Sequence, residues 1–423
     1  MAVYLDEQLD DEPMFGNVAR YLEMSPSISM ERVIKLIYGE NTRASLLGRN
    51  YSHVAAETQS CWGLASREII NRMTLFPYVS RFLNEDASNG LIGQMLVSKS
   101  EGKTRGSWPA LGNKGVRFCM RCLAEDLEQQ VPKHWRRTHQ LPGVIICVHH
   151  MEFLWMHAVG EVRNFLSFIT PEVARAEGVS PLVQETMDVR KDAALQYAKL
   201  SHDLLNERMT IDRRCVYEIF KENIINKIRY RDRGELRKSI SLLIDNCFGD
   251  DYLRCVGYRE SIIPDLTGRH GFEAARVLWI VIFATMLELI DRDPSLLDDC
   301  DFKAVYGDAP LESFRRKPYF RERPPVECPN TLAGHGAGHI VERTAWRDST
   351  LQCACTCGMR FRCDELDVGI GPPQITRWGE TYVQEVMRLR SAGYNPSDIS
   401  KMLGLPVRTA FNIYSALSTI GQK

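Results

Sequence analysis

The sequence predicts a mainly α-helical, multidomain protein with two small zinc modules, a zinc finger and a zinc ribbon, and a C-terminal helix-turn-helix. Three observations predict this fold class. Apolar residues recur at helical spacing along most of the chain. Cysteine and histidine pairs stand at metal-ligand spacing in two separate places, and two short helical patterns flank a glycine-containing turn near the C-terminus. A chain of 423 residues is also too long for one compact core, so we expect several domains.

The composition limits the partners that the whole chain can attract. The formal net charge is -1, so any nucleic-acid surface has to be local. The first residues are acidic and do not resemble a signal peptide, so the 13 cysteines are expected to stay reduced and available to metal. The most apolar run, residues 275–290, is short and charge-flanked, which favours a buried core helix over a membrane span. We therefore expect a cytoplasmic protein with no membrane partner.

The N-terminal region, residues 1–116, is expected to be helical. Apolar spacing predicts short helices over residues 13–21, 29–38 and 66–73. In the proline-kinked segment that follows, Phe76, Tyr78 and Phe82 are expected to pack in a core. Residues 84–116 are rich in glycine and are interpreted as mostly loop. A solvated linker is the preferred interpretation, and a flexible arm near phosphate is the alternative.

A first zinc finger is predicted over residues 117–157. Cys119 and Cys122 form a C-x-x-C pair, and the C-x-x-H pair downstream is formed by Cys147 and His150. Two such knuckles supply four ligands, which closes a tetrahedral shell and leaves no position for a catalytic water. The spacing therefore predicts structural zinc. His149 stays open as an alternative to His150.

Three cations, Lys133, Arg136 and Arg137, lie between the two knuckles beside Trp135. Cations with an interleaved aromatic residue are typical of a surface that follows nucleic-acid phosphates. A solvated loop has the same composition, so both interpretations stay open.

Residues 158–307 are expected to form a helical domain. Thr170 is a candidate cap for a helix that begins at Pro171. Further apolar periods predict helices over residues 191–205, 214–229, 233–247 and 262–297.

A basic, proline-rich linker is predicted over residues 308–327, and a second zinc ribbon over residues 328–370. The ribbon offers more candidate ligands than a zinc ion has places. The preferred set is Cys328, His335, Cys355 and Cys357. His339 is the alternative to His335, and the roles of Cys353 and Cys363 stay open.

Residues 374–423 carry the helix-turn-helix pattern, with helices expected over residues 376–391, 396–403 and 407–417. In this motif the N-terminal residues of the second helix meet base edges in the major groove, which here are Arg408, Thr409 and Asn412. Lys401 and Arg377 are expected to contact phosphates. The expected core residues of the motif are Ile399, Leu403, Val407 and Ile413.

At this point the chain resembles the TnsD/TniQ family of transposon target-selection proteins. The resemblance rests on FGNVARY near the N-terminus, on TLFPYVSRFL, and above all on CMRC followed by THQLPGVIICVHH. LTGRHGF, the CTCGMRF knuckle and the C-terminal helix-turn-helix follow in the family order. One departure concerns the second finger, where family members often have a cysteine and this chain has Leu332 and Ala333. That departure makes His335 the preferred ligand.

The resemblance implies a bacterial mobile-element protein that selects the place of insertion and associates with the nucleoid during transposition. Members of the family bind an attachment site on double-stranded DNA or dock on an RNA-guided CRISPR effector complex. They recruit an AAA+ ATPase regulator and do not cut or join DNA. A homodimer and two bound Zn²⁺ ions are further expectations.

The residues themselves agree that the chain is not an enzyme. Both predicted metal sites are filled by protein ligands, and no phosphate-binding glycine loop or nucleophile–base pair is recognisable. Two function classes remain: a sequence-specific DNA binder that marks the insertion site, and an adaptor on a guide-RNA complex with little DNA binding of its own.

Overall fold

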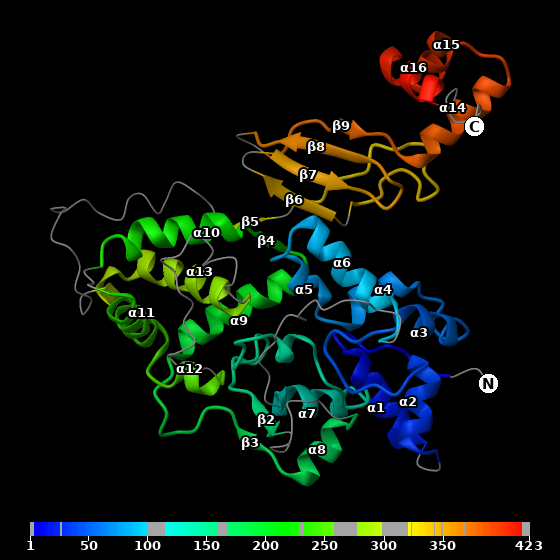
Figure 1. Ribbon diagram of the computed structural model, residues 1–423. Helices are drawn as coiled ribbons and strands as arrows, with labels where there is room; N and C mark the ends of the chain where they lie inside the picture. Colours follow the sequence, from blue (N-terminus) through cyan, green and yellow to red (C-terminus); the bar gives the residue numbers. More distant parts are fainter. Residues whose placement is uncertain are drawn as a thin grey trace. The chain divides into compact units, whose positions relative to one another are not determined.

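The structure, a computed structural model, is mainly helical and divides into two compact units, Met1–Phe320 and Arg321–Lys423 (Figure 1). It describes residues 4–25, 28–99, 115–158, 168–228, 232–257, 277–297, 320–322, 324–341, 343–347, 350–366 and 369–416. The sequence predicts a finer division into six segments, from residues 1–116 to residues 374–423, and that division stays a prediction. Within the described residues, no helix combines the length and the apolar character needed to cross a membrane.

The first part of the larger unit is a cluster of short helices. These are α1 (Met14–Met24), α2 (Met30–Tyr38), α3 (Tyr51–Glu57), α4 (Ser66–Met73), α5 (Phe76–Ser80) and α6 (Glu85–Leu96). The three helices predicted by apolar spacing are confirmed as α1, α2 and α4. The aromatic residues Phe76, Tyr78 and Phe82 are buried, as expected of core packing.

The prediction of loop after residue 84 was wrong for its first part, because α6 occupies Glu85–Leu96. The side chain of Asn84 accepts a hydrogen bond from the backbone N–H of Ala87 and so caps the helix. Leu91, Ile92 and Met95 then recur at helical spacing and are buried. Residues 100–114 of the predicted loop lie outside the described residues.

The rest of the larger unit surrounds one apolar helix. Its elements are β1 (Gly115–Phe118), α7 (Met120–Glu128), η1 (Thr138–Gln140), β2 (Trp155–Ala158), α8 (Pro171–Glu177), β3 (Ser180–Pro181), α9 (Lys191–Leu205), β4 (Met209–Ile211), α10 (Arg213–Phe220), the π-helical η2 (Lys221–Ile225), α11 (Arg233–Phe248), α12 (Tyr252–Cys255), α13 (Val277–Arg292) and η4 (Pro294–Leu297). In Figure 1, α13 lies among α9, α10 and α11, and it packs against each of them. Its side chains from Leu278 to Ile290 are buried except that of Glu288, as expected of a core helix.

Two sequence predictions in this part are confirmed and one needs correction. Thr170 caps α8 by accepting from the backbone N–H of Val173, and α9 has the predicted bounds. The single helix predicted over residues 214–229 is instead α10 followed by the π-helical turn η2. Residues 258–276, which include the start of the helix predicted at 262, lie outside the described residues.

The smaller unit combines a four-stranded antiparallel sheet with three helices, in the order β6 (Arg343–Arg347), β7 (Thr350–Ala354), β8 (Arg360–Asp364), β9 (Gln374–Arg377), α14 (Glu380–Ser391), α15 (Pro396–Leu403) and α16 (Val407–Ala416). The strand β5 (Phe320–Glu322) stands at the boundary of the units. One apolar cluster joins the inner face of the sheet to the helices, through residues such as Phe361, Val386 and Ala410.

Two details of the C-terminal region differ from the sequence prediction. The helix expected from residue 376 begins at Glu380, because Gln374–Arg377 pairs with β8 as β9. Val407, expected in the core, is 58% exposed, whereas Ala410 is fully buried. Val407 is the first residue of α16, and the face that packs inward begins one turn later.

Candidate metal centres

The first metal cluster is assembled by a local sheet. Antiparallel pairing places Phe118 of β1 opposite Trp155 of β2. This pairing returns the chain so that the loop carrying Cys147 meets the start of α7, where Cys119 is the N-cap residue and Cys122 lies in the first turn.

Four ligand atoms converge in this cluster: the sulfurs of Cys119, Cys122 and Cys147 and Nδ1 of His150. The sulfurs of Cys122 and Cys147 are 3.7 Å apart, and Nδ1 of His150 lies 3.5 Å from the sulfur of Cys119 and 3.3 Å from that of Cys122. A tetrahedral zinc ion with bonds of about 2.3 Å to sulfur requires ligand separations of about 3.8 Å. A disulfide would require sulfurs about 2.05 Å apart. The donor set therefore fits zinc.

The histidine of this cluster is His150, because its outer nitrogen is held by a carboxylate. Nε2 of His150 lies 2.7 Å from Oε1 of Glu125 on α7. A carboxylate that accepts from the outer nitrogen fixes the imidazole with its other nitrogen toward the metal. The ring of the alternative, His149, instead packs edge-on against His202.

The thiols show why the site suits a cation. Hydrogen bonds from the thiols of Cys122 and Cys147 lower the pKa of Cys119 far below its ordinary value. The pKa of Cys122 is raised, because its thiol is held by Cys119 and Cys147 and is buried. The protein alone thus stabilises one thiolate. A bound Zn²⁺ supplies the positive charge that the remaining thiolates need.

His139 was not identified as part of this centre by sequence reasoning. Its Nε2 lies 4.0 Å from the sulfur of Cys122, and burial lowers its pKa to about 3, so the ring is neutral. His139 begins the HQLPG run at residues 139–143, and other residues of this run have contacts away from the metal cluster. Gln140 binds the backbone of Arg117, and the hydroxyl of Tyr197 donates to the carbonyl of Pro142. The run therefore also anchors the cluster to the helical core.

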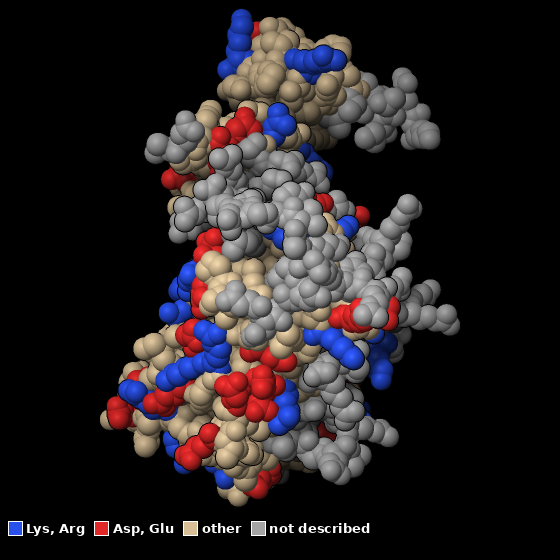
Figure 2. Space-filling view, turned by 90° about the vertical axis from the view of Figure 1, so that its left-hand side faces the viewer, with Lys and Arg blue, Asp and Glu red and all other residues tan. Residues whose placement is uncertain are grey.

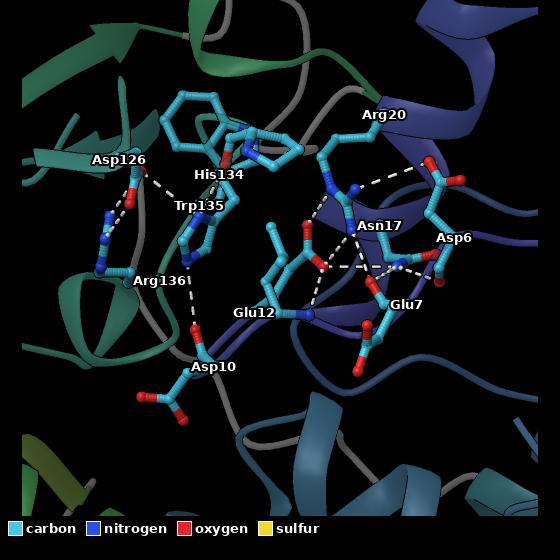
Figure 3. A network of polar contacts seen from close by, with 12 residues as sticks. Asp6, Glu7, Asp10, Glu12, Asn17, Arg20, Asp126, His134, Trp135 and Arg136 are labelled. Carbon is cyan, nitrogen blue, oxygen red and sulfur yellow. Dashed lines mark hydrogen bonds and ion pairs between the residues drawn. The ribbon is translucent and has the colours of Figure 1, made fainter. Parts of the chain in front are cut away.

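The acidic N-terminal segment is tied to the same region (Figure 3). Asp126 on α7 accepts from both terminal nitrogens of Arg136, at 2.6 and 3.2 Å, and lies 3.3 Å from Nδ1 of His134. Nε2 of His134 lies 3.2 Å from the backbone carbonyl oxygen of Asp10. The hydrogen bonds of His134 and Arg136, and their charges, outweigh burial and lower the pKa of Asp126.

A second ion pair of this network is fully inside the protein. Arg20 of α1 donates from Nε to Glu12 at 2.8 Å and from a terminal nitrogen at 2.9 Å, and Asn17 donates to the same carboxylate (Figure 3). Two charges removed from water are stable together only when their hydrogen bonds are satisfied, as they are here. The FGNVARY run is therefore a structural clamp on the N-terminal segment.

These contacts account for the cations between the two knuckles. Arg137 is buried and donates to Asp11 and to the backbone carbonyls of Asn71 and Thr74. Lys133 pairs with Glu172 at 2.7 Å. With the Arg136–Asp126 pair, each of the three cations has a partner within the protein, and their contact with nucleic-acid phosphates stays a prediction.

The second metal cluster lies in the smaller unit and unites Cys328, His335, Cys355 and Cys357. The sulfurs of Cys328 and Cys357 are 3.7 Å apart, and Nε2 of His335 lies 3.4 Å from the sulfur of Cys355. Nδ1 of His335 lies 2.8 Å from the backbone oxygen of Gly336, which leaves Nε2 as the metal-facing nitrogen. These separations also fit tetrahedral zinc.

The electrostatics of the second cluster resemble those of the first. Burial raises the pKa of Cys328 to about 12. Burial also acts on Cys357, but the backbone N–H of Met359 and the side chains of His335 and Asn330 outweigh it and lower the pKa to about 7. The amide of Asn330 donates to the sulfur of Cys357 at 3.3 Å.

The other candidate ligands of the ribbon, His339, Cys353 and Cys363, lie outside the second cluster. The ring of His339 stacks on that of His335, with centroids 4.2 Å apart, and its nitrogens are not among the clustered ligand atoms. Cys353 of β7 and Cys363 of β8 are buried on the inner face of the sheet, in the apolar cluster.

The predicted DNA-contacting residues near the C-terminus lie on three elements. Arg408 and Asn412 are exposed on α16, Thr409 is half-buried there, and Lys401 is exposed on α15. Arg377 is exposed on β9 instead of on a helix. In Figure 2, blue side chains stand out on the C-terminal helices, whereas blue and red are interspersed over the larger unit.

Comparison with known families adds one finding. The sequence model of the TniQ family matches residues 6–154. The match begins in the acidic N-terminal segment and ends just after the first metal cluster, so it includes all four ligands of that cluster. No curated protein matches the chain.

Proposed function

We propose, from the premise that the TniQ domain at residues 6–154 makes this chain a transposition-associated protein of the TniQ/TnsD kind, that its role is to select the site of insertion. In this role the smaller unit binds target DNA, and the TniQ domain recruits an AAA+ ATPase regulator. The observation that carries the proposal is the combination of a TniQ domain with a second unit that pairs a zinc-ribbon sheet with three short helices.

The helices of the smaller unit support DNA binding through a helix-turn-helix. Asn395 caps α15, and Gly404 ends it in the left-handed region with φ of 63°, so that the chain turns directly into α16. The sequence of α16, VRTAFNIYSA, contains one arginine and no acidic residue. Its exposed Arg408 and Asn412 suit the edges of guanine and adenine, which accept and donate in the pattern of these side chains.

The TniQ domain offers a surface for a protein partner. Met24 at the end of α1 is 70% exposed, and Met30 at the start of α2 is 52% exposed. Exposed methionines adapt to a partner's surface because their side chains are flexible and polarisable. We assign the contact with the AAA+ regulator to this corner between α1 and α2.

The chain acts in this scheme without bond chemistry of its own. Each metal cluster has four protein ligands, three thiolates and one imidazole. A zinc ion with four protein ligands has no open position at which to activate water. The proposed role of both ions is therefore to stabilise the fold.

One alternative has specific support. The net charge is -1, and the larger unit binds its cations Arg136 and Arg137 internally. A chain with this charge is expected to bind DNA weakly by itself. This expectation favours an adaptor, dimeric or monomeric, that reaches DNA through an RNA-guided CRISPR effector complex.

The two roles differ in a direct DNA-binding experiment. Full-length zinc-loaded protein is incubated with a random duplex library, bound sequences are selected, and affinity is measured over a salt series. A site selector enriches a defined sequence, and both Arg408→Ala and Asn412→Ala weaken binding to it by about 1–3 kcal/mol. An adaptor enriches none and co-purifies with a guide-RNA complex, which would reject the first proposal.

A further inference from the structure

Contacts on the inner side of α16 fix its rotation about its own axis. Ala410 is fully buried in the apolar cluster of the smaller unit, and Ile413 and Tyr414 pack against that cluster. Arg390 of α14 donates to the backbone oxygen of Tyr414 at 2.7 Å, and its guanidinium lies 4.6 Å from the centre of the Tyr414 ring. Because side-chain direction follows the helical period, these contacts also determine which residues of α16 face outward.

The turn that leads into α16 is held as firmly. The backbone N–H of Leu405 donates to the carbonyl of Ser400 at 3.0 Å, and the hydroxyl of Ser400 donates to the carbonyl of Leu405 at 2.6 Å. The side chain of Leu405 is itself buried in the apolar cluster. The start and the rotation of α16 are therefore both set by its packing on α14 and α15, so its outer face is formed by the fold of this unit alone.

The outer face of α16 consists of two adjoining rows of side chains. Residues four apart lie one above the other on a helix, so Val407 and Phe411 form one row. By the same spacing, Arg408 and Asn412 form the row beside it, and both are exposed. We call Val407 and Phe411 the apolar row. Thr409, which the helix-turn-helix pattern predicts as a base contact, is half-buried outside both rows, and its contact stays a prediction.

The apolar row exposes more apolar surface than the packing of the unit explains. Val407 is 58% exposed and Phe411 is 56% exposed. Neither side chain belongs to the apolar cluster that the described residues of this unit form. Transfer of such surface from water to a partner is favourable, and adjacent exposed apolar side chains mark surfaces that bind.

The row beside it restricts which partner can cover the apolar row. An apolar protein surface would bury the charge of Arg408 and the amide of Asn412 without hydrogen bonds, which is costly. The major groove of DNA offers both kinds of contact: polar base edges for arginine and asparagine, and the 5-methyl groups of thymine for apolar side chains. The sequence of α16 contains no acidic residue, so this face does not repel the negatively charged duplex.

We infer that the apolar row contacts thymine 5-methyl groups in the major groove, so that Val407 and Phe411 determine part of the sequence that the chain selects. The inference rests on the proposed function and specifies it. Arginine suits guanine and asparagine suits adenine, and each adenine is paired with a thymine whose methyl group projects into the same groove. The selected site therefore contains thymine at or beside the base pairs that Arg408 and Asn412 contact.

The test removes single methyl groups from the DNA. The duplex that full-length, zinc-loaded protein selects from the random library is prepared with each thymine replaced in turn by deoxyuridine, which lacks only the 5-methyl group. Affinity is measured by fluorescence anisotropy. Burial of one methyl group corresponds to about a fourfold change in affinity, so deoxyuridine at a contacted position weakens binding by about this factor. At the other thymines the replacement leaves affinity unchanged.

The variant Phe411→Ala connects the methyl effect to one side chain. It binds the selected duplex more weakly than wild type, and deoxyuridine at the thymine that Phe411 contacts causes no further loss. The thymine that Val407 contacts stays sensitive in this variant and becomes insensitive in Val407→Ala. Because the same duplexes are compared with each protein, any effect of the methyl group on DNA shape cancels. Phe411→Leu keeps an apolar group at this position and retains most of the sensitivity.

Met387→Ala is the matched control. Met387 is an apolar residue of α14 that is 44% exposed, and the variant is expected to bind every duplex as wild type does. Zinc content and a far-UV circular dichroism spectrum equal to those of wild type verify that each variant is folded. Since Phe411 lies outside the apolar cluster, its replacement is expected to preserve both.

Several outcomes overturn the inference. Wild type insensitive to deoxyuridine at every thymine would do so, and so would equal sensitivity in wild type and Phe411→Ala, or an equal loss in Met387→Ala. A Phe411→Ala protein that binds selected and scrambled duplexes more weakly by the same factor, and that loses a dimer in light scattering, would assign the apolar row to a contact between copies of the chain.

Failure of the proposed function gives a different result. If wild type enriches no sequence from the library, the proposed function fails and the inference fails with it. If a sequence is enriched and its affinity depends on Arg408 but on no methyl group, the proposed function stands and only the inference fails.

Discussion

The two metal clusters have the same set of ligands, three cysteines and one histidine, but different surroundings. In the first, Cys119, Cys122 and Cys147 are each at most 2% exposed, and Glu125 fixes the histidine. In the second, Cys328 and Cys355 are each 7% exposed, and the histidine is fixed by the backbone of the neighbouring glycine. Identical donor sets can thus be integral to a large core or stabilise a small module locally.

The two clusters differ in the other contacts that stabilise the structure around them. Around the first cluster, the contacts of Arg137 with Asp11 and of His134 with the backbone of Asp10 join segments far apart in the sequence. The apolar cluster of the smaller unit contains fewer residues than that of the larger unit. The binding free energy of a structural zinc ion is folding free energy of the unit that holds it, and the two units differ in size. Removal of each ion is therefore expected to have effects of different extent.

The largest effect is expected from loss of the first cluster. In Cys147→Ser the site loses a thiolate, and the binding free energy of structural zinc, about 10–16 kcal/mol, exceeds or equals the stability of a typical domain. We expect one zinc ion per chain and unfolding of the larger unit, measured by metal analysis and far-UV circular dichroism. Cys61→Ser, at a half-buried cysteine outside both clusters, is the control. A folded Cys147→Ser protein would show that the two clusters do not differ in this way.

A smaller, local effect is expected at the second cluster. His335→Ala should also leave one zinc ion per chain, but proteolytic sensitivity should rise only within Arg321–Lys423. His339→Ala, which removes the stacked neighbour, should retain both ions. Metal analysis and limited proteolysis measure both outcomes. Loss of an ion in His339→Ala would mean that the two histidines exchange as ligands.

A smaller loss of metal affinity is expected when the carboxylate partner of His150 is changed, because His335 of the second cluster has a backbone partner instead. Glu125→Gln weakens the bond to Nε2 of His150, and loss of such a partner typically lowers metal affinity about 10–100-fold. Competition with a chromogenic chelator measures the affinity of the first site against the second. Glu128→Gln, on an exposed position of the same helix, is expected to change nothing. Equal affinities in Glu125→Gln and Glu128→Gln would argue against a role of the carboxylate.

The smallest effect is expected from a helix cap in the smaller unit. The side chain of Asn395 accepts from the backbone N–H groups of Ser397 and Asp398, so Asn395→Ala should cost about 1 kcal/mol. Hydrogen exchange in α15 should accelerate by about fivefold, while exchange in α9 of the larger unit stays the same. Exchange that also accelerates in α9 would mean that the two units unfold together.

The residues that the sequence predicts as metal ligands lie together in two clusters, but the sequence did not indicate all of their neighbours. Knuckle spacing is a property of one tight turn, so Cys119 and Cys122 could be paired without knowledge of the fold. The choice between His149 and His150 depended on Glu125, which lies 25 residues away in the sequence. Similarly, the sequence pattern placed Arg137 among candidate surface cations, because its partner Asp11 lies 126 residues away in the sequence.

The sequence by itself determined the local structure: the helices α4, α9 and α15, the caps Thr170 and Asn395, and the spacing of both ligand sets. These depend on propensity and hydrogen bonds within a few residues. Only the tertiary structure decided which cations are buried, which histidine lies in the first cluster, and which residues pair across the strands of the sheet. Burial and cross-strand pairing bring together residues that are distant in the chain. Packing, and not local spacing, determines which residues become neighbours in this way.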